Sequence, residues 1–316
     1  MGNKPVDEFS VDWLALREPA DRWARSEDLA RDLALWVSSP LQSRPATLLD
    51  LGAGAGSNLR FLAPLIDGAQ RWICLDKDAG LLATLKTRTA AWAAARGLTP
   101  TAEGEDQRIL GRGVDWRIET RLVDLAQGSD ALPSAPGTLV VASALMDLVS
   151  GPWLADLLRA CWRDRSPLLA AISYDGRVEL APPEPLDGLV IALVNGHQGR
   201  DKGLGPALGP SAPRALARLG RSLGYRLRGA ESDWRLDPNQ TGIQECLIAG
   251  WADAARGQVR DALGARAGAV RQPFDSIDRW QDARLGHVAA GRSRLRVGHQ
   301  DLLLLPGHAP GDGDVG

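Results

Sequence analysis

The chain has few cysteines, very few lysines and almost no net charge. Its three cysteines, Cys74, Cys161 and Cys246, lie far apart inside apolar stretches, so we expect three buried thiols rather than disulfides or a CxxC metal site. The 37 basic residues, of which only four are lysine, are scattered singly among 39 acidic residues, and the formal net charge is -2. A nucleic-acid-binding protein would gather its basic residues into a patch or stripe. The sequence therefore predicts no nucleic-acid partner and no bound metal.

Long apolar runs are also lacking. No stretch approaches the ~18 apolar residues of a membrane-spanning helix. The first residues, MGNKPVDEFSVDWL, carry acidic groups where a secretory signal peptide would be basic and then apolar. We therefore expect a cytoplasmic protein with no membrane partner, and the pattern predicts no particular oligomeric state. With 316 residues, of which 44% are hydrophobic, the chain can bury a sizeable core.

Apolar segments of strand length alternate with amphipathic segments of helix length, which predicts an α/β fold with a parallel sheet. Pro19 is expected to break the first helix, and residues 97–113, rich in glycine and acidic residues, are expected to form a loop. Strands are predicted at 47–51, 71–76, 114–124, 137–144, 167–175, 225–236 and 299–306, and helices at 13–38, 57–67, 80–96, 150–162, 189–198, 211–223, about 240–265 and 274–290.

The segment LDLGAGAGSNL, residues 49–59, places three glycines after a predicted strand and at the start of a predicted helix. Glycines let the backbone approach a ligand and leave the N–H groups of the helix start free to bind it. A dinucleotide-binding GxGxxG loop would have glycine where Ser57 stands, and the carboxylate of Asp50 would repel a pyrophosphate. The ligand should therefore carry a positive charge near Asp50.

Two more acidic residues are predicted at strand ends. Asp76 ends the second strand, where a carboxylate can accept hydrogen bonds from both hydroxyls of a ribose. Asp124 closes the third strand within VDLA, where it could meet an adenine amino group. Each of the three aspartates has a structural alternative, as a cap or as a solvated turn residue.

Four segments, LDLGAGAG, LDKD, LVDLA and VVASALMDLV, occur in this order and resemble the strand-end motifs of class I S-adenosylmethionine-dependent methyltransferases over about residues 45–175. The resemblance implies a Rossmann-like sheet of seven strands with helices on both faces and an antiparallel last strand, for which 225–236 and 299–306 are the expected final pair. The chain departs from the family pattern by a long helical insertion between those two segments.

The resemblance also implies S-adenosylmethionine as the cofactor and S-adenosylhomocysteine as its product. The methionine amine is expected near Asp50 and Gly52, the ribose on Asp76, and the adenine beside Asp124 and Leu125. The residues predicted to bind the cofactor are Arg25, Asp50, Gly52, Ala53, Gly54, Gly56, Asn58, Asp76, Lys77, Asp124, Leu125 and Ser143.

The resemblance and the element pattern together divide the chain. Residues 1–44 are predicted to form a helical lid, with Arg17 or Arg25 near the methionine carboxylate; the alternative is an exposed amphipathic helix. Residues 45–306 are the predicted methyltransferase domain, with insertions at 185–210 and 240–292, and 307–316 is predicted to be a disordered tail.

Ligands of open α/β sheets lie at the carboxyl ends of the strands, so the methyl acceptor should lie over the fourth and fifth strands. The segment NGHQGRDKGLGPALGP, residues 195–210, follows the fifth strand and could close the acceptor pocket; a surface linker is the alternative. Asp147, Tyr174 and His197 are the predicted catalytic residues, and Asp147, Tyr174, Asp175, His197, Arg200 and Lys202 the predicted acceptor-binding residues. We expect a structural role for His287, His299 and His308.

The function that best fits these features is methyl transfer from S-adenosylmethionine to a small molecule, with specialised metabolism as the expected setting. One alternative is a ribosomal-RNA or protein methyltransferase, which the scattered basic residues and the missing N/D-P-P-Y/F motif disfavour. Another is a non-catalytic or repurposed fold that only binds S-adenosylmethionine, because a fold does not fix a function.

Overall fold

The computed structural model describes residues 10–37, 45–128, 132, 135–268 and 270–307. Its strands are β1 (Ala46–Leu51), β2 (Gly68–Asp76), β3 (Thr99–Glu103), β4 (Asp106–Gly111), β5 (Val114–Leu122), β6 (Leu139–Ser143), β7 (Leu168–Ala181), β8 (Arg226–Glu231), β9 (Trp234–Leu236) and β10 (Arg294–Leu305). Its helices are α1 (Val11–Ala24), α2 (Glu27–Val37), α3 (Ser57–Leu62), α4 (Ala79–Ala94), α5 (Gly151–Arg163), α6 (Asp187–Gln198), α7 (Ala212–Leu223), α8 (Thr241–Leu263) and α9 (Gln272–Ala289), with short 3-10 turns η1 (Ala63–Leu65), η2 (Leu125–Gln127), η4 (Gly209–Ser211) and η5 (Gly264–Arg266).

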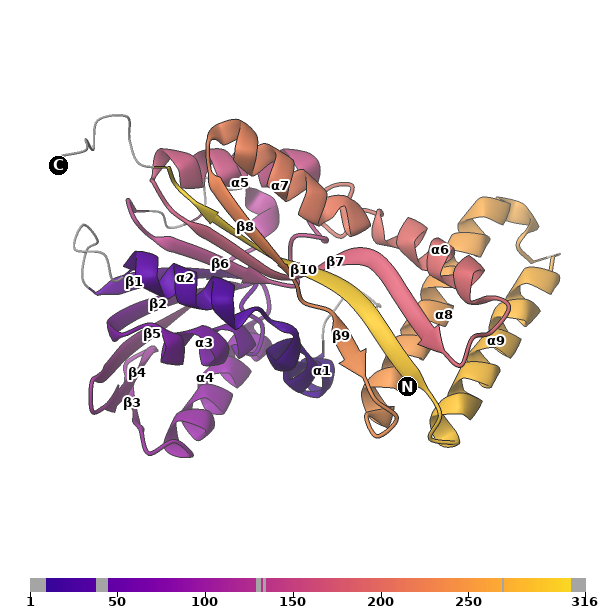
Figure 1. Cartoon of the computed structure of the whole chain (residues 1–316), viewed down its shortest axis with the longest axis horizontal. Coiled ribbons are helices and arrows are strands. Elements are labelled where there is room, and N and C mark those ends of the chain that lie inside the picture. The colour runs from indigo at the N-terminus through magenta and orange to yellow at the C-terminus, as the bar shows by residue number, and fades with distance from the viewer. Residues whose placement is uncertain (1–9, 38–44, 129–131, 133–134, 269, 308–316) are drawn as a thin grey trace.

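The strands form a mixed sheet in the order β3-β4-β5-β2-β1-β6-β7-β10-β8, and β9 pairs with β10 (Figure 1). β1 runs parallel to β2 on one side and to β6 on the other. On the first side, β5 follows β2 as its parallel partner, and on the second side β7 follows β6 as its parallel partner. β10 is antiparallel to both β7 and β8. This order confirms the Rossmann-like fold that the methyltransferase resemblance implied, including the pairing of segments 225–236 and 299–306. The described sheet has ten strands rather than seven, because β3, β4 and β9 are added.

Helices cover both faces of the sheet, as the sequence predicts. Successive residues of a strand point to opposite faces, so Leu48 and Leu49 of β1 enter different cores. α2, α3 and α4 contribute to the core that contains Leu48, whereas α5 and α7 contribute to the core that contains Leu49. The two cores hold the carboxyl ends of β1 and β6 side by side, which is where a doubly wound sheet binds its ligand.

β7 and β10 have 14 and 12 residues and extend beyond the other strands as a two-stranded arm (Figure 1). α6, α8 and α9 pack on this arm and on β9 around a third core that includes Trp234, Trp251 and Trp280. The ladder between β7 and β10 shifts register twice, between Val297 and His299 and again between Gln300 and Leu302. Such bulges bend a strand pair, which accounts for the turn of the arm away from the main sheet.

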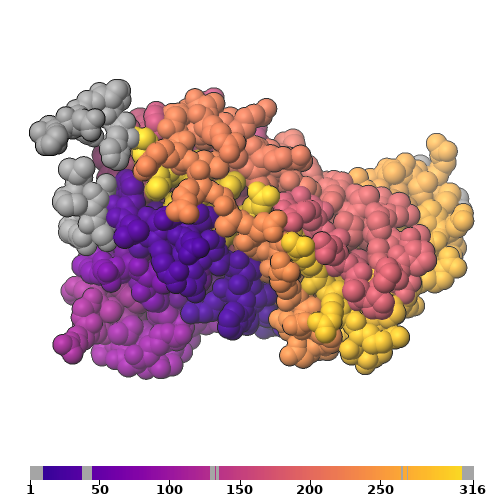
Figure 2. All heavy atoms as spheres, viewed as in Figure 1, coloured from indigo at the N-terminus to yellow at the C-terminus, as the bar shows by residue number. Residues whose placement is uncertain are grey.

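α1 lies where the arm leaves the sheet. It contacts β9 and α8, and Ala20 belongs to the third core. Figure 2 shows the indigo N-terminal residues between the purple half of the sheet and the orange and yellow residues of the arm. The N-terminal helix therefore bridges the two parts of the molecule.

The prediction of a loop at 97–113 is wrong. These residues form the hairpin of β3 and β4, and β4 pairs with β5 at the edge of the sheet. Gln107 and Ile109 are buried while their neighbours are more exposed, which is the alternation of a strand. The many glycines and acidic residues in this segment made the short alternation of apolar and polar residues hard to recognise in the sequence.

Other local predictions also need correction. α1 continues through Pro19, because its buried residues fix it against the rest of the protein, and the chain leaves the helix only at Arg25. Cys246 is exposed, although Cys74 and Cys161 are buried as expected. Parts of the segment 1–44, and the tail from His308 onward, lie outside the described residues.

Candidate active site

The glycine loop connects β1 to α3 at the carboxyl end of the sheet. Gly52, Gly54 and Gly56 have φ values of +63°, +51° and +83°, a region that favours glycine. A Cβ atom at Gly56 would lie only 2.7 Å from Cγ of Leu85, so this position also lacks space for a side chain. The N–H of Ala53 donates to the carbonyl of Leu75 at 2.8 Å, which fixes the loop against the end of β2.

Asp76 lies directly beside this loop. Its Oδ2 accepts from the N–H of Gly54 at 2.8 Å, and its Oδ1 accepts from the N–H of Asp78 at 2.9 Å. Burial raises the pKa of Asp76, while these backbone hydrogen bonds lower it. Each carboxylate oxygen keeps a second lone pair, so Asp76 can still accept from ligand hydroxyls.

A chain of hydrogen bonds joins four of the predicted cofactor-binding residues. Nδ2 of Asn58 donates to Oδ1 of Asp50 at 2.8 Å. Arg25 donates from Nη1 to Oδ1 of Asn58 at 3.3 Å and from Nη2 to Oγ of Ser143 at 2.5 Å. The guanidinium of Arg25 also stacks over the ring of Phe61, with its Cζ 5.1 Å from the ring centroid. The structure thus brings α1, β1, α3 and β6 together around one charged group.

Two atoms of this network are buried without a hydrogen-bond partner among the described residues. They are Nε of Arg25, a donor, and Oδ2 of Asp50, an acceptor. Asp50 is 1% exposed, and burial raises its pKa to about 7, against the hydrogen bond from Asn58 and the charge of Arg25. An unsatisfied buried polar atom costs about 1–3 kcal/mol. Arg25 can therefore donate one more hydrogen bond at this position, and Asp50 can accept one.

α1 covers the glycine loop. A Cβ at Gly54 would lie 3.2 Å from Cδ1 of Leu14, so this leucine rests on the loop. Glu18 accepts two hydrogen bonds of 2.8 Å from Arg60 of α3. Arg60 in turn donates to the carbonyl of Ala55 at 2.8 Å, within the loop itself. These contacts hold α1 over the glycine loop, and its role as a lid stays a prediction.

The predicted adenine-binding residues differ in their settings. Leu125 is buried, and its carbonyl accepts from Nε1 of Trp153 at 2.8 Å. Asp124 does not close the third strand, because β5 ends at Leu122; it is exposed and caps η2 by accepting from the N–H of Ala126 at 2.9 Å. Lys77 is exposed beside Asp76. Leu125 is thus part of a buried apolar cluster, whereas the side chains of Asp124 and Lys77 face solvent.

The predicted acceptor side also contains buried polar groups. Asp147 is 9% exposed, and burial raises its pKa to about 6. Tyr174 is buried, its hydroxyl donates to Oδ1 of Asn195 at 2.7 Å, and burial raises its pKa. Asp175 accepts from Nε of Arg177 at 2.8 Å. Asp147 and Tyr174 are thus brought together, while Asp175 is held by its neighbour on β7.

The segment 199–210 lies against the end of β6 with its backbone. The N–H of Gly209 donates to the carbonyl of Asp147 at 2.9 Å, and that of Leu208 donates to the carbonyl of Val149 at 2.8 Å. The side chain of Arg200, in the same segment, is directed to α8 instead. Arg200 donates to Gln258 at 2.8 Å and lies 2.5 Å from Asp261, both on α8.

His197 stands in the last turn of α6. A Cβ at Gly257 of α8 would lie 3.6 Å from its ring, so the ring faces α8. Lys202 is half-buried within the segment 199–210. The structure therefore brings His197 and Arg200 to α8. Asp147 follows the end of β6, whereas Tyr174 and Asp175 lie in the middle of β7, which continues to Ala181 instead of ending at residue 175 as predicted.

A second group lies near Asp147. The sequence placed Arg17 near the methionine carboxylate and gave His299 a structural role, but it did not connect either of them with Asp21 or Trp234. Arg17 of α1 donates to both oxygens of Asp21, at 3.0 and 3.1 Å, and its guanidinium lies over the ring of Trp234, 4.8 Å from the centroid. His299, buried in the middle of β10, packs on Trp234 with ring centroids 4.9 Å apart. No sequence motif marks these residues, because they come from α1, β9 and β10.

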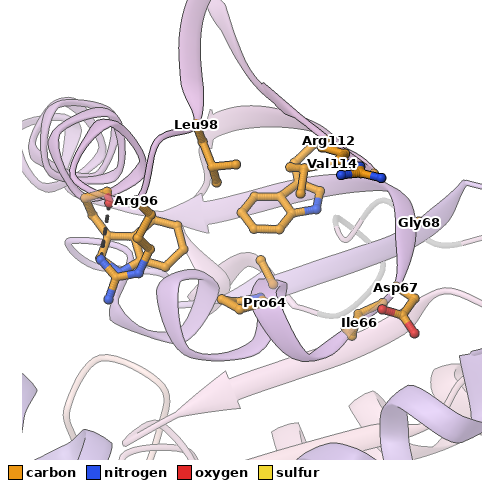
Figure 3. A pocket seen from close by; sticks show the side chains of 12 residues that line it. Pro64, Ile66, Asp67, Gly68, Arg96, Leu98, Arg112 and Val114 are labelled. Carbon is orange, nitrogen blue, oxygen red and sulfur yellow. Dashed lines mark hydrogen bonds between the residues drawn. The ribbon is translucent and has the colours of Figure 1, made fainter.

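Two surface hollows lie elsewhere. One, of about 390 Å³, is lined by Trp92, Trp116 and Arg112 and lies at the amino ends of β2 and β5, where Gly68 and Val114 stand (Figure 3). The other, of about 550 Å³, is lined by Trp23 and residues around β9. Among the described residues, no group of three or more His, Cys, Asp and Glu could hold a metal ion, and no helix is long and apolar enough to cross a membrane.

No protein-family model and no curated protein matches the chain. Solved structures that match it include a cyclopropane synthase from Mycobacterium tuberculosis, at 14% identity and a TM-score of 0.44, with 94% of this chain and 95% of that chain covered. An S-adenosylmethionine-dependent methyltransferase from Thiobacillus denitrificans, in complex with S-adenosyl-L-homocysteine, matches at 15% identity and a TM-score of 0.42, with 94% and 99% covered. These similarities concern the fold alone.

Proposed function

We propose that the protein binds S-adenosylmethionine and transfers its methyl group to a small molecule. The observation that carries this proposal is the pair of buried atoms without partners, Nε of Arg25 and Oδ2 of Asp50. An α-amino acid group presents a carboxylate, which can accept from Arg25, and an ammonium, which can donate to Asp50. The methionine part of the cofactor satisfies both atoms at once, and a pyrophosphate would satisfy only one.

The surrounding residues fit the rest of the cofactor. The positive-φ glycines keep side chains out of the loop, and Asp76 at the end of β2 is the acceptor for the ribose hydroxyls. Leu125 offers an apolar surface for the adenine, with the exposed Asp124 next to it. When bound, S-adenosylmethionine supplies an activated methyl group on a sulfonium. The chain holds the cofactor, excludes water and orients the acceptor.

A small acceptor is favoured over a macromolecule because the acceptor side lies beneath α1. Asp147 and Tyr174 are both buried there, so RNA or a protein side chain would have to pass the lid. The near-neutral net charge also lacks the excess of basic residues that phosphate binding requires.

Calorimetric titration with S-adenosylhomocysteine tests the cofactor site. Arg25→Met and Asp50→Asn should each weaken binding at least tenfold, since charged hydrogen bonds contribute about 1.5–3 kcal/mol. Arg31→Met and Asp156→Asn make the same chemical changes at exposed ion pairs of α2 and α5 and should leave binding unchanged. Wild-type affinity in both Arg25→Met and Asp50→Asn would overturn the assignment.

Turnover is tested separately. The protein is incubated with S-adenosylmethionine and with RNA, protein or ultrafiltered small-molecule fractions of a cell extract, and formation of S-adenosylhomocysteine is measured. Product should form with the small-molecule fraction. Product with RNA or protein would favour the macromolecular alternative, and binding without product in any fraction would favour the non-catalytic one.

A further inference from the structure

A second pair of buried polar atoms lies on the acceptor side. Oδ1 of Asp147 and Nδ1 of His299 have no hydrogen-bond partner among the described residues. Asp147 is 9% exposed and His299 is 5% exposed, so solvent does not satisfy these atoms. Asp147 follows β6 and His299 belongs to β10, so the two groups come from separate parts of the chain.

Tyr174 and Arg17 place both groups in one environment. Tyr174 is the register partner of His299, with ring centroids 6.0 Å apart. A backbone hydrogen bond from Tyr174 reaches the carboxyl group of Asp147, and the charge of Asp147 raises the pKa of Tyr174. The charge of Arg17 lowers the pKa of both Asp147 and His299. Both atoms without partners therefore belong to groups that neighbour Tyr174 and lie within the influence of Arg17 of α1.

Aromatic rings lie beside His299. Trp234 packs on His299, and Trp13 of α1 meets Trp234 edge-on with ring centroids 6.3 Å apart. An apolar body can lie against these rings while a polar group reaches Asp147 and His299.

We propose that Asp147 and His299 together bind the reacting nitrogen of a small amine that carries an aromatic or other apolar body, both accepting hydrogen bonds from its N–H groups. The inference rests on the proposed function and names its acceptor class. A nucleophile must keep a lone pair free for the methyl group. A primary amine has two N–H donors for the two protein acceptors and one lone pair left over, whereas a hydroxyl has a single donor.

The same environment keeps the amine neutral. Burial and the charge of Arg17 lower the pKa of His299 to about 4, although Asp21, Asp175 and Asp233 oppose this. Burial and the charge of Arg17 likewise favour the neutral form of a bound amine, against the carboxylate of Asp147. The nitrogen lone pair then forms the bond to the transferred methyl carbon while the carbon–sulfur bond breaks and its electron pair stays on sulfur. The N–H proton passes to the carboxylate of Asp147, so the products are the methylated amine and S-adenosylhomocysteine.

The tautomer of His299 gives the first test and needs no ligand. Nitrogen-15 NMR of the free protein, with His299→Gln to assign the signal, should report an unprotonated Nδ1 and a protonated Nε2 at pH 7. A protonated Nδ1 would make His299 a donor and would overturn the inference.

Matched probes give the second test. Benzylamine and benzyl alcohol differ only in the donor group, and their binding is measured by calorimetry with S-adenosylhomocysteine at saturation. Benzylamine should bind at least tenfold more tightly and release about one proton, seen as a dependence of the heat on the buffer's ionisation enthalpy. Asp147→Asn should reduce the preference to less than threefold. Glu179→Gln, the same change at an exposed position of β7, should keep it.

Equal binding of the two probes, binding of neither, or binding of the amine without proton release would overturn the inference. Because S-adenosylhomocysteine binding is measured first, a failure here with normal cofactor binding leaves the proposed function intact. Circular dichroism would show whether Asp147→Asn folds. If it does not, the comparison of benzylamine with benzyl alcohol on the wild-type protein still tests the inference.

Discussion

Glu18 and Arg60 join α1 to α3 through two hydrogen bonds of 2.8 Å each. Arg60 is buried and also bonds the glycine loop at Ala55, so this ion pair connects the lid directly to the predicted cofactor site. Leu14, one turn earlier in α1, rests on Gly54 of the same loop. Opening of α1 must break this pair.

Glu18→Gln should therefore loosen the lid. The variant leaves a buried guanidinium without its counter-charge, and breaking a buried pair costs up to about 3–5 kcal/mol, less here because Glu18 is partly exposed. We expect the dissociation rate of S-adenosylhomocysteine, measured by stopped-flow fluorescence, to rise about threefold to tenfold. Glu27→Gln breaks an exposed pair on α2 and serves as the control. Equal rates in Glu18→Gln and wild type would contradict the lid assignment.

Cofactor binding should depend on pH through Asp50. Burial raises the pKa of Asp50 to about 7, and the ammonium of the ligand binds only the ionised form. The ionised fraction of Asp50 should rise about eightfold from pH 6 to pH 7.5. An α-amino group with a pKa of about 7.7–8.0 loses part of its charge over the same range, so the affinity should rise about fivefold to sixfold. Calorimetry across this range checks the slope. Asp50→Asn should bind weakly and show no such slope.

The same aspartate should limit the stability of the ligand-free protein. Because the folded pKa of Asp50, about 7, lies above the unfolded value of 3.8, the folded state binds the extra proton, and stability falls as pH rises from about 4 to 7. Asp50→Asn removes this loss, which is at most ~4 kcal/mol. Its unfolding temperature at pH 8, measured by calorimetry, should exceed that of wild type by several degrees. Asp156→Asn, at an exposed position, should not change it, and a destabilised Asp50→Asn would refute the expectation.

Gly56 should tolerate no side chain. Gly56→Ala introduces strain at φ +83° and a contact of 2.7 Å with Leu85, while Gly97→Ala introduces strain at φ +73° with open space around it. The control should lose about 1 kcal/mol in denaturant unfolding, and Gly56→Ala should lose about 1–3 kcal/mol more from overpacking. Similar losses in both variants would mean that Leu85 moves aside without cost.

Much of the central sheet could be predicted because its signals are local. The apolar strands that contain Asp50 and Asp76 are directly followed by glycines or acidic residues in the sequence. The order of these strands along the chain and their ends can therefore be predicted from neighbouring residues. The hairpin at 97–113 could not, since its pairing with β5 is a tertiary contact and its residues have weak strand preference.

The acceptor side was harder for a related reason. His299 was expected to begin the last strand and to have only a structural role. β10 in fact begins at Arg294, and the bulge after Val297 sets how His299 faces Tyr174. A register shift of this kind follows from pairing partners far away in the sequence, which no short motif encodes.

The two-stranded arm has a consequence for how such a protein could diversify. In the sheet, β7 lies next to β6 and β10 lies next to β7. In the chain, α6, α8 and α9 all lie between β7 and β10. The glycine loop, Asp50 and Asp76 all precede β7. Insertions, deletions and substitutions between residues 182 and 293 can therefore reshape what lies against Trp234 while the first half of the chain stays unchanged. Exchange of that one contiguous segment would change the surroundings of the predicted acceptor side and leave the residues predicted to bind the cofactor in place.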